Sequence, residues 1–404
     1  MRYLIVIIFW IFCLLGSNSW ASPYTLDQLD ADLVSSNPKL KALQLNYLAL
    51  RSYIKSEASF NDLTAGVEWR GQQRSLFLAQ QVPFWGKLND LEKVAAFESQ
   101  EAYFEYADYQ NQLHQEIMKL IYRQKILKEK FKIYSEELKT YDQTQAGLSA
   151  RLASGKGSMA DLYALKLAKT NLQKQLIDLK QQQTEVIQAL IERIPVNAEV
   201  SFENPLPALT ALSVNSDQVL KNLFEKNYLL RQKQMAIQKR FWQLELARKG
   251  YFPDFNVKVG SMETPGMKNE LMGEFSINIP WFNARHDGQV EWTQSLGEMN
   301  ESELLALQRE LKSKTTVLLS LWKNILEKNS LITEQTLKFT KLRYESIKNL
   351  YQTDQADLSD LTAARREFLQ AKLEALDLQE QGLSTYLDLM ILVPSISSPL
   401  KEAL

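Results

Sequence analysis

Histidine, cysteine and glycine are scarce in this 404-residue chain, which contains 2 His, 1 Cys and 14 Gly. The single cysteine, Cys13, lies near the N-terminus, so no disulfide or thiolate site is expected in the rest of the chain. Neither His114 nor His286 has an acidic residue or a second histidine three or four positions later, the spacing that pairs metal ligands on a helix. We therefore expect no metal, no cofactor and no catalytic site, and an enzyme is poorly supported.

An excess of one charge and long apolar runs are also lacking. The 47 basic and 48 acidic residues nearly balance, which excludes the basic surface of a nucleic-acid-binding protein. Residues 1–21 combine Arg2, an apolar run from Leu4 to Leu15 and a small-residue site at Ser19-Trp20-Ala21, so we expect a signal peptide for export, with a retained anchor as the alternative. Cys13 has no convincing lipobox around it. No later segment reaches about eighteen apolar residues, so any later membrane crossing must use strands.

Two stretches alternate between apolar and polar residues with the period of a β-strand. In one, the runs 254–259 and 271–279 flank a loop that contains Pro265-Gly266, a turn dipeptide, and together they predict a hairpin over residues 253–280. The other predicts a hairpin over residues 62–82. We expect the two strands of the 253–280 hairpin to be roughly nine to ten residues long, the length that a tilted strand needs to cross a bilayer. A half-buried hairpin in a soluble domain is the alternative for either stretch taken alone.

The sequence around the hairpins is rich in Leu, Lys, Gln, Glu and Ala, a composition typical of long helices. Apolar residues recur at three, four and seven positions over residues 87–194 and 285–393, which predicts two long helical hairpins packed as coiled coils. Their turns are expected at 155–158 and 354–357, and the second long helix is expected to run from about residue 287 to 350. Residues 195–215 are interpreted as a linker and residues 394–404 as a C-terminal tail.

The order of these elements indicates an internal duplication. Residues 22–194 and 216–393 each contain a helix, a β-hairpin and a long helical hairpin. Asn37 aligns with Asn227, and the strand exit at Pro83 aligns with the one at Pro280. Pro83 lies 78 positions before Asp161, and Pro280 lies 80 positions before Asp360, which supports the alignment.

Four strands are too few to close a barrel of the bacterial outer-membrane type, which has about eight or more. An open sheet edge in lipid would leave unpaired backbone groups that cost several kcal/mol each. Other copies of the chain must therefore complete the strands, and three copies would give twelve strands, wide enough to leave a lumen. The expected fold class is mainly α with a small β part. We expect duplicated antiparallel coiled-coil helices that form an α-barrel, and two β-hairpins that contribute four strands to a transmembrane β-barrel, which would be twelve-stranded in a trimer.

With these features the chain resembles the TolC-like outer-membrane efflux proteins over essentially its whole length after residue 21. The resemblance rests on the duplicated plan, the strand exits Pro83 to Lys87 and Pro280 to Arg285, and the turn from Gly155 to Leu162. It implies a homotrimer in the outer membrane of a Gram-negative cell. The trimer would extend into the periplasm and dock through its helical tips onto a periplasmic adaptor (membrane fusion) protein and an inner-membrane pump. The second turn has Asp354 where the first has Gly155, a departure from the family's pattern.

Two groups of residues are candidate sites. An acidic entrance and adaptor-docking tip is expected from Gly155, Gly157, Asp161, Asp354, Asp357 and Asp360, with Lys156 or Arg365 as partners of the aspartates across subunits. Plain capping of a helix start is the alternative for each aspartate. Aromatic residues at the strand ends are expected at the bilayer interface, with packing at the strand-to-helix corner as the alternative: Trp69, Phe84, Trp85, Phe252, Trp281 and Phe282.

The function expected from sequence is the outer-membrane channel of a tripartite efflux or export system, a passive conduit from the periplasm to the exterior. A soluble periplasmic coiled-coil adaptor or binding protein is the alternative from another class, although it leaves the two alternating hairpins without a purpose. The exported substrate, whether metal, drug, peptide or protein, stays open at this stage.

Overall fold

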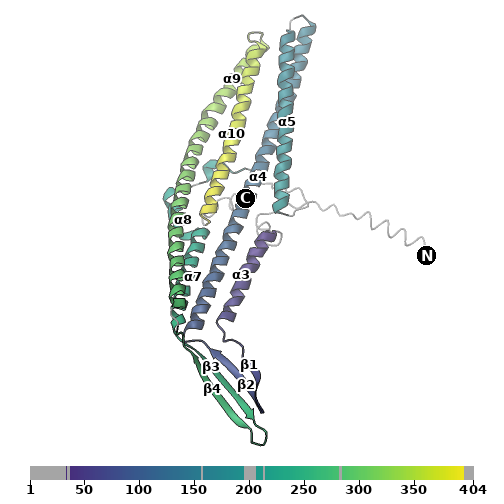
Figure 1. Ribbon diagram of the computed structural model, residues 1–404. Coiled ribbons are helices and arrows are strands. Elements are labelled where there is room, and N and C mark those ends of the chain that lie inside the picture. Colours follow the sequence, from purple (N-terminus) through teal and green to yellow (C-terminus); the bar gives the residue numbers. More distant parts are fainter. Residues whose placement is uncertain are drawn as a thin grey trace, which may run out of the picture.

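A computed structural model describes residue 33 and residues 37–155, 158–194, 206–212, 214–281 and 284–394. The molecule is long and narrow, with helices over most of its length and a small sheet at one end (Figure 1). Several predictions lie outside the described residues: the signal peptide over 1–21, Lys156, Gly157, Phe282, most of the 195–215 linker, and all of the 394–404 tail except Pro394.

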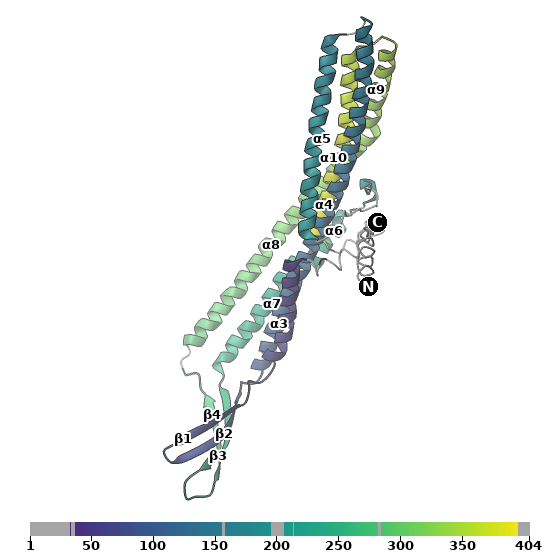
Figure 2. The same cartoon turned by 90° about the vertical axis from the view of Figure 1, so that its right-hand side faces the viewer.

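The first half of the chain contains helix α3 (Pro38–Glu57), strands β1 (Thr64–Arg70) and β2 (Gln73–Val82), and helices α4 (Lys87–Ala153) and α5 (Met159–Arg193). The two strands lie within the segment predicted as a hairpin. Helix α4 has 67 residues, which corresponds to about 100 Å at 1.5 Å per residue. It runs from the sheet to the opposite end of the molecule, where α5 turns back alongside it (Figures 1 and 2).

The second half repeats this order. A short 3-10 helix η1 (Leu209–Ala211) and helix α6 (Ser216–Lys226) precede α7 (Tyr228–Arg248), the 3-10 turn η2 (Lys249–Tyr251), and strands β3 (Asp254–Glu263) and β4 (Glu270–Asn278). Helix α8 (Ala284–Leu331), the π-helical segment η3 (Ile332–Thr336) and α9 (Leu337–Gln352) then lead to the second tip, and α10 (Leu358–Leu392) returns from it.

The single helix predicted over 287–350 is thus interrupted by the π-helical segment η3. A π-turn accommodates extra residues inside an otherwise α-helical run. The second half is two positions longer than the first between strand exit and tip, since Pro280 to Asp360 exceeds Pro83 to Asp161 by that amount. The extra length therefore falls in the helix that contains η3, and the helix still reaches the tip.

Local geometry repeats along with the order of elements. The side-chain oxygen of Asn37 accepts a hydrogen bond from Leu40 N at 3.0 Å and caps α3, and Asn227 does the same for α7 through Leu230 N at 3.0 Å. At the tips, Gly155 has φ +75° and the aligned Asp354 has φ +57°. The two asparagines therefore cap corresponding helices, and the two tip residues share the left-handed backbone conformation.

The four strands form one antiparallel sheet in the order β1-β2-β3-β4. Thr64 faces Ala79 in the first hairpin and Asp254 faces Asn278 in the second, while Val82 faces Phe255 between the hairpins. The outer edges of β1 and β4 are not paired with any other strand in the described part of the chain. The fold prediction of a mainly helical chain with four strands in two hairpins is confirmed.

The core runs along the helical bundle as layers of apolar side chains. On α5 the buried residues recur at spacings of seven and then four positions, as the predicted coiled-coil seam requires: Leu165, Leu172, Leu179, Val186 and Leu190. Each such side chain contributes about 1.5–3 kcal/mol when fully buried. Among the described helices, none is both long and apolar enough to span a membrane.

Candidate functional site

One face of the sheet is apolar and exposed. Its side chains come from alternate positions of all four strands, and several are more than half exposed, with Leu271 at 88%, Leu76 at 65% and Phe275 at 63%. The remaining members are Ala65, Val67, Leu78, Val82, Phe255, Val257, Val259 and Ile277. An apolar surface of this extent is unfavourable in water, so it requires an apolar environment or a partner.

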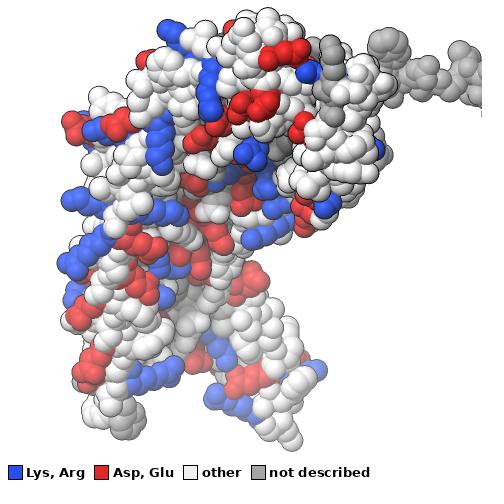
Figure 3. Space-filling view, turned by 90° about the horizontal axis from the view of Figure 1, so that it is seen from above, with Lys and Arg blue, Asp and Glu red and all other residues white. Residues whose placement is uncertain are grey.

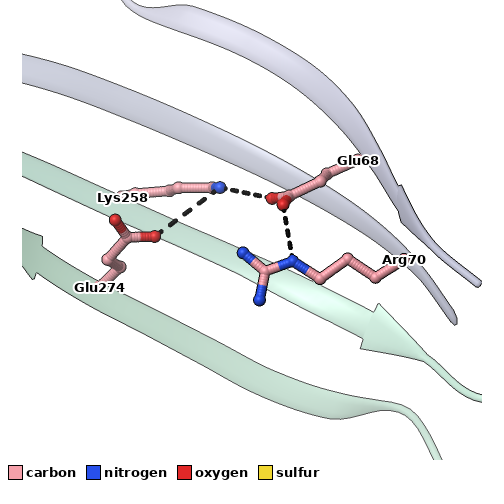
Figure 4. Close-up of polar contacts among 4 residues, drawn as sticks. All are labelled: Glu68, Arg70, Lys258 and Glu274. Atoms are coloured by element: carbon pink, nitrogen blue, oxygen red, sulfur yellow. Dashed lines mark hydrogen bonds and ion pairs between the residues drawn. The ribbon is translucent and has the colours of Figure 1, made fainter.

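The opposite face of the sheet carries a cluster of four charged side chains. Lys258 Nζ lies 2.8 Å from Glu68 Oε2 and 3.8 Å from Glu274 Oε2, and Arg70 Nε lies 2.9 Å from Glu68 Oε1 (Figure 4). Lys258 lies on β3, so it connects the neighbouring strand β4 with β1, which is two strands away on the other side. The cluster contains two acids and two bases, so the polar face is hydrophilic there without a large net charge.

Phe77 is the one large aromatic side chain on the polar face of β2, and two glycines make room for it. Gly66 and Gly260 are its direct neighbours on β1 and β3. A Cβ atom at Gly66 would lie 2.4 Å from Phe77 Cζ, and one at Gly260 would lie 2.3 Å from the Leu76 carbonyl oxygen. Lys258 Nζ also lies 4.0 Å from the centre of the Phe77 ring, a cation–π distance. The polar face is therefore closely packed at mid-strand.

The predicted interface aromatics fall at two levels of the sheet. Trp69 pairs with Arg74 beside the β1–β2 turn, at the end of the sheet away from the helices, and is 68% exposed. The others lie where the strands meet the helices: Trp85 and Trp281 are 92% and 81% exposed, and Phe84 stacks on Phe252 with ring centres 4.5 Å apart. Phe84 and Phe252 thus pack against each other at the strand-to-helix corner, whereas the three tryptophans are largely exposed.

At the helical tip, both turns contain a residue in the left-handed region, Gly155 and Asp354. A left-handed backbone costs about 1–2 kcal/mol for most L-residues and less for Asp. Arg151 Nη2 lies 2.6 Å from Asp354 Oδ1, so an ion pair links the end of α4 to the second turn. Viewed from the tip, basic and acidic side chains are interspersed (Figure 3), so a partner at this end would meet a mixed polar surface.

The other predicted tip aspartates lie nearby with different roles. Asp357 is the N-cap residue of α10, yet its side chain makes no capping hydrogen bond, and Asp360 lies in the first turn of that helix. Asp161 lies in the first turn of α5 and lines a groove of about 300 Å³ between the two helical hairpins, together with Tyr141 and Arg366.

Within the chain, Arg365 contacts α4 below the tip, and its expected pairing with the tip aspartates across subunits stays a prediction. It is 6% exposed and forms an ion pair with Glu137 of α4, and its guanidinium lies 4.6 Å from the Tyr141 ring. Burial raises the pKa of Glu137 above its ordinary 4.5, and the charge of Arg365 opposes that rise. Arg365 therefore holds α10 against α4 below the tip, and Arg151 takes the position beside Asp354.

Sequence reasoning missed the charged cluster of the sheet. Glu68 and Lys258 both occupy polar positions of the predicted strands, so their face could have been assigned by alternation. Their proximity could not, because it depends on the register of β2 against both neighbours. Among the described residues no group of three or more His, Cys, Asp or Glu side chains could hold a metal ion.

No protein-family model matches the sequence, and no curated protein is similar to it. Solved structures do match. CusC, described in the context of transmembrane channel formation, aligns with a TM-score of 0.78 and 13% identity over 94% of this chain and 95% of that chain. The outer membrane protein VceC of Vibrio cholerae aligns at 0.76 and 14%, covering 91% and 95%. The outer membrane channel MtrE of Neisseria gonorrhoeae aligns at 0.73 and 14%, covering 91% and 88%.

At these identities the match establishes the fold. The chain has the fold of outer-membrane channel proteins along nearly all of its length, and the resemblance to TolC-like proteins is confirmed at that level.

Proposed function

We propose that this protein is the outer-membrane channel of a tripartite efflux or export system, a passive conduit from periplasm to exterior. The observation that carries the proposal is the sheet: one exposed apolar face, one charged face and two unpaired edges, at the end of a long helical bundle. The shared fold with outer-membrane channels supports it. In this reading the apolar face contacts lipid and the charged face lines a water-filled interior.

The unpaired edges support a homotrimer. An edge strand in lipid has backbone N–H and C=O groups without hydrogen-bond partners, which is costly, whereas a closed barrel leaves none. Three copies would supply twelve strands, enough to enclose a lumen. The helices would then continue the wall of the tube into the periplasm. The chain's part is passage and docking, without catalysis.

The aromatic residues at two levels support a membrane-spanning position for the sheet. Tryptophan prefers the boundary between hydrocarbon and water, and outer-membrane barrels carry such residues on both sides of an apolar band about 25 Å tall. Trp69 would lie at the outer boundary, and Trp85, Trp281 and Phe252 at the periplasmic one. Phe84 would support Phe252 from the corner.

The tip is proposed as the periplasmic entrance and the docking site for an adaptor protein, which in turn contacts an inner-membrane pump. The groove that contains Asp161 supports this, because it lies between the two helical hairpins beside the turns with Gly155 and Asp354. The opposite end holds the sheet (Figure 1). Asp354, Asp357 and Asp360 would each recur three times around the axis of a trimer, which would favour cations at the entrance.

Single cysteines on the two faces of β4 test the proposal in a Cys13→Ala background. Phe275→Cys lies on the apolar face, and the neighbouring Ser276→Cys is its control on the polar face. In cells, Phe275→Cys should react with a lipid-soluble maleimide and resist a charged one, while Ser276→Cys should react with the charged reagent. Equal reaction of both with the charged reagent, or recovery of the protein as a soluble periplasmic monomer, would refute the proposal and favour the adaptor.

A further inference from the structure

A polar contact holds the two repeats together at the corner where strands meet helices. Asp254, at the start of β3, accepts hydrogen bonds from Phe84 N at 2.8 Å and from Lys87 Nζ at 2.7 Å through the same carboxylate oxygen. Lys87 Nζ also donates to the Phe252 carbonyl oxygen at 3.2 Å. The Lys87 and Asp254 side chains are only 13% and 24% exposed. The exit from β2 is thereby fixed to the entrance of β3, beside a β2–β3 ladder that runs from Arg74 to Val82.

The two hairpins have the same register, so each residue of this contact has a counterpart in the other repeat. Asp254 faces Asn278, two positions before Pro280. In the first hairpin Thr64 faces Ala79, and continuing that register by two positions brings Asp62 opposite Gln81, two positions before Pro83. The ladders also end alike next to the turns, where Arg70 faces Gln73 and Met262 faces Glu270. Asp62 thus corresponds to Asp254, and Trp281, next to Pro280, corresponds to Phe84.

The counterpart of Lys87 is Arg285, the basic residue at the start of α8, one position further from its proline. Asp62 and Arg285 are both exposed, and neither pairs with another residue in the described part of the chain. Within one chain they belong to opposite edges of the sheet, since β1 and β4 are separated by β2 and β3. Each edge of the sheet therefore carries one partner of such a corner contact: the acidic Asp62 at the β1 edge and the basic Arg285 at the β4 edge.

In the proposed trimer, β4 of one copy lies antiparallel beside β1 of the next. We propose that this seam has the register of β2 on β3 and is completed by an ion pair between Arg285 of one copy and Asp62 of the next. In the β2–β3 pair, Val82 lies opposite Phe255. The same register at the seam places Ile279 opposite Leu63, Ile277 opposite Ala65 and Phe275 opposite Val67. Asp62 of the next copy then accepts hydrogen bonds from Trp281 N and from the Arg285 guanidinium. This inference rests on the proposed channel function and specifies how its subunits join.

The proposed register agrees with the faces of the strands. Phe275 and Ile277 are apolar and exposed, and they come opposite Val67 and Ala65, which lie on the same face of β1. A register shifted by one residue would put them beside polar positions, because neighbouring residues point to opposite faces.

On the charged face, the register brings Glu274 opposite Glu68 of the next copy. Arg70 of that copy lies on the diagonal, close enough for a long side chain to reach both carboxylates. In the single chain the Arg70 side chain is 78% exposed and pairs only with Glu68 among the described residues. It is therefore available to offset the like charges at the seam.

Disulfide cross-linking tests the register in a Cys13→Ala background. Directly opposite residues have Cβ atoms about 4.5–5.5 Å apart and diagonal ones about 7–8 Å apart, so only the former readily form a disulfide. The double variants F275C/V67C and N278C/T64C should give covalent dimers and trimers on oxidation. The matched pairs F275C/A65C and F275C/W69C, shifted by two residues each way, should stay largely monomeric on a denaturing gel.

A charge exchange tests the corner contact. Asp62→Arg and Arg285→Asp should each lower the temperature at which the detergent-extracted trimer dissociates, and the double variant should recover most of the loss. Lys268→Asp, in the exposed β3–β4 turn, is the control and should leave that temperature unchanged. Additive losses in the double variant would overturn the ion pair.

Native mass measurement separates failure of this inference from failure of the proposed function. A trimer that cross-links preferentially through a shifted pair would overturn the register and leave the channel intact. A monomer would overturn both.

Discussion

Gly260 and Leu76 lie so close across the β2–β3 ladder that a Cβ atom on Gly260 would be 2.3 Å from the Leu76 carbonyl oxygen. The obstructing atom belongs to the backbone, so it cannot turn aside as a flexible side chain would. The same glycine lies opposite Phe77, the aromatic side chain of the charged face. This contact lies on the β2–β3 pair, which joins the two repeats in the described sheet, and substitutions there should separate them.

We therefore predict that Gly260→Ala impairs assembly. A displaced backbone weakens the β2–β3 pairing, and overpacking typically costs about 1–3 kcal/mol. The measurement is the yield of heat-resistant oligomer in the membrane fraction. Gly147→Ala, on α4 and outside the sheet, is the control, because a Cβ there meets nothing within 4 Å. Equal yields from the two variants would contradict the predicted role of the close approach.

A second prediction concerns Asp354 at the second tip. Its φ of +57° favours glycine, so Asp354→Gly relieves backbone strain while it removes the exposed ion pair to Arg151. The two effects are each about 1 kcal/mol or less and oppose one another, so stability should change little. Asp354→Val should lose about 1–2 kcal/mol, because a β-branched side chain resists the left-handed region.

The apparent melting temperature of the purified protein measures both Asp354 variants. Asp357→Val is the control, since Asp357 has an extended backbone with φ −85° and its side chain makes no capping bond. A Val variant at 354 as stable as the one at 357 would show that the turn relaxes at no cost.

A third prediction follows from the buried Glu137. Because its pKa in the folded state is raised above 4.5, the folded protein binds more protons than the unfolded chain between that value and the folded pKa. The associated stabilisation is fully present below the unfolded pKa and is lost as the pH rises through the folded one. Stability should therefore fall with rising pH over this window, and Glu137→Gln should flatten that part of the curve.

Melting temperature measured across this pH range provides the test of the Glu137 prediction. The overall stability of Glu137→Gln will shift as well, because Arg365 stays buried without its counter-ion, so the slope is the informative quantity. Glu136→Gln alters an exposed neighbour and should keep the wild-type slope. If Glu137→Gln also keeps the wild-type slope of melting temperature against pH, Glu137 does not titrate as predicted.

A fourth prediction concerns Tyr386, which is fully buried beside Tyr122 and Trp322 in the core. Both tyrosine hydroxyls are buried without a hydrogen-bond partner among the described residues, and burial raises the pKa of each. Removing an unsatisfied buried hydroxyl is neutral or favourable, so Tyr386→Phe should keep or increase the melting temperature. Tyr386→Ala should lower it strongly, since truncating a buried aromatic costs about 3–5 kcal/mol. A loss in Tyr386→Phe would mean that the hydroxyl has a partner.

Much of the fold followed from periodicity in the sequence. The leucines of α5 sit in the core at the predicted spacing, and the alternating runs form the strands. The π-helical segment was missed because each stretch around it is locally a good helix. The only sign of it was the two-residue difference in spacing between the repeats. A comparison of the two halves carried information that neither half carried alone.

The candidate site was less predictable, because its contacts join residues far apart in the chain. Arg365 lies close to the tip in sequence, yet its partner Glu137 is set by how α10 packs on α4. Arg151 was passed over for the same reason, since its pairing with Asp354 depends on the two tips meeting. The tryptophans needed no such information, because their position at the strand ends is local.

The two β-turns at the far end of the sheet differ in length, with only Gly71 and Gln72 between β1 and β2 but residues 264–269 between β3 and β4. In the proposed trimer, an observer outside the cell would therefore see three prominent loops alternating with three tight turns, although the ladders beneath repeat six times. An antibody or phage that approaches the cell would meet the longer loops first. A peptide epitope inserted beside Gly266 should accordingly be displayed on intact cells without disturbing the strands below.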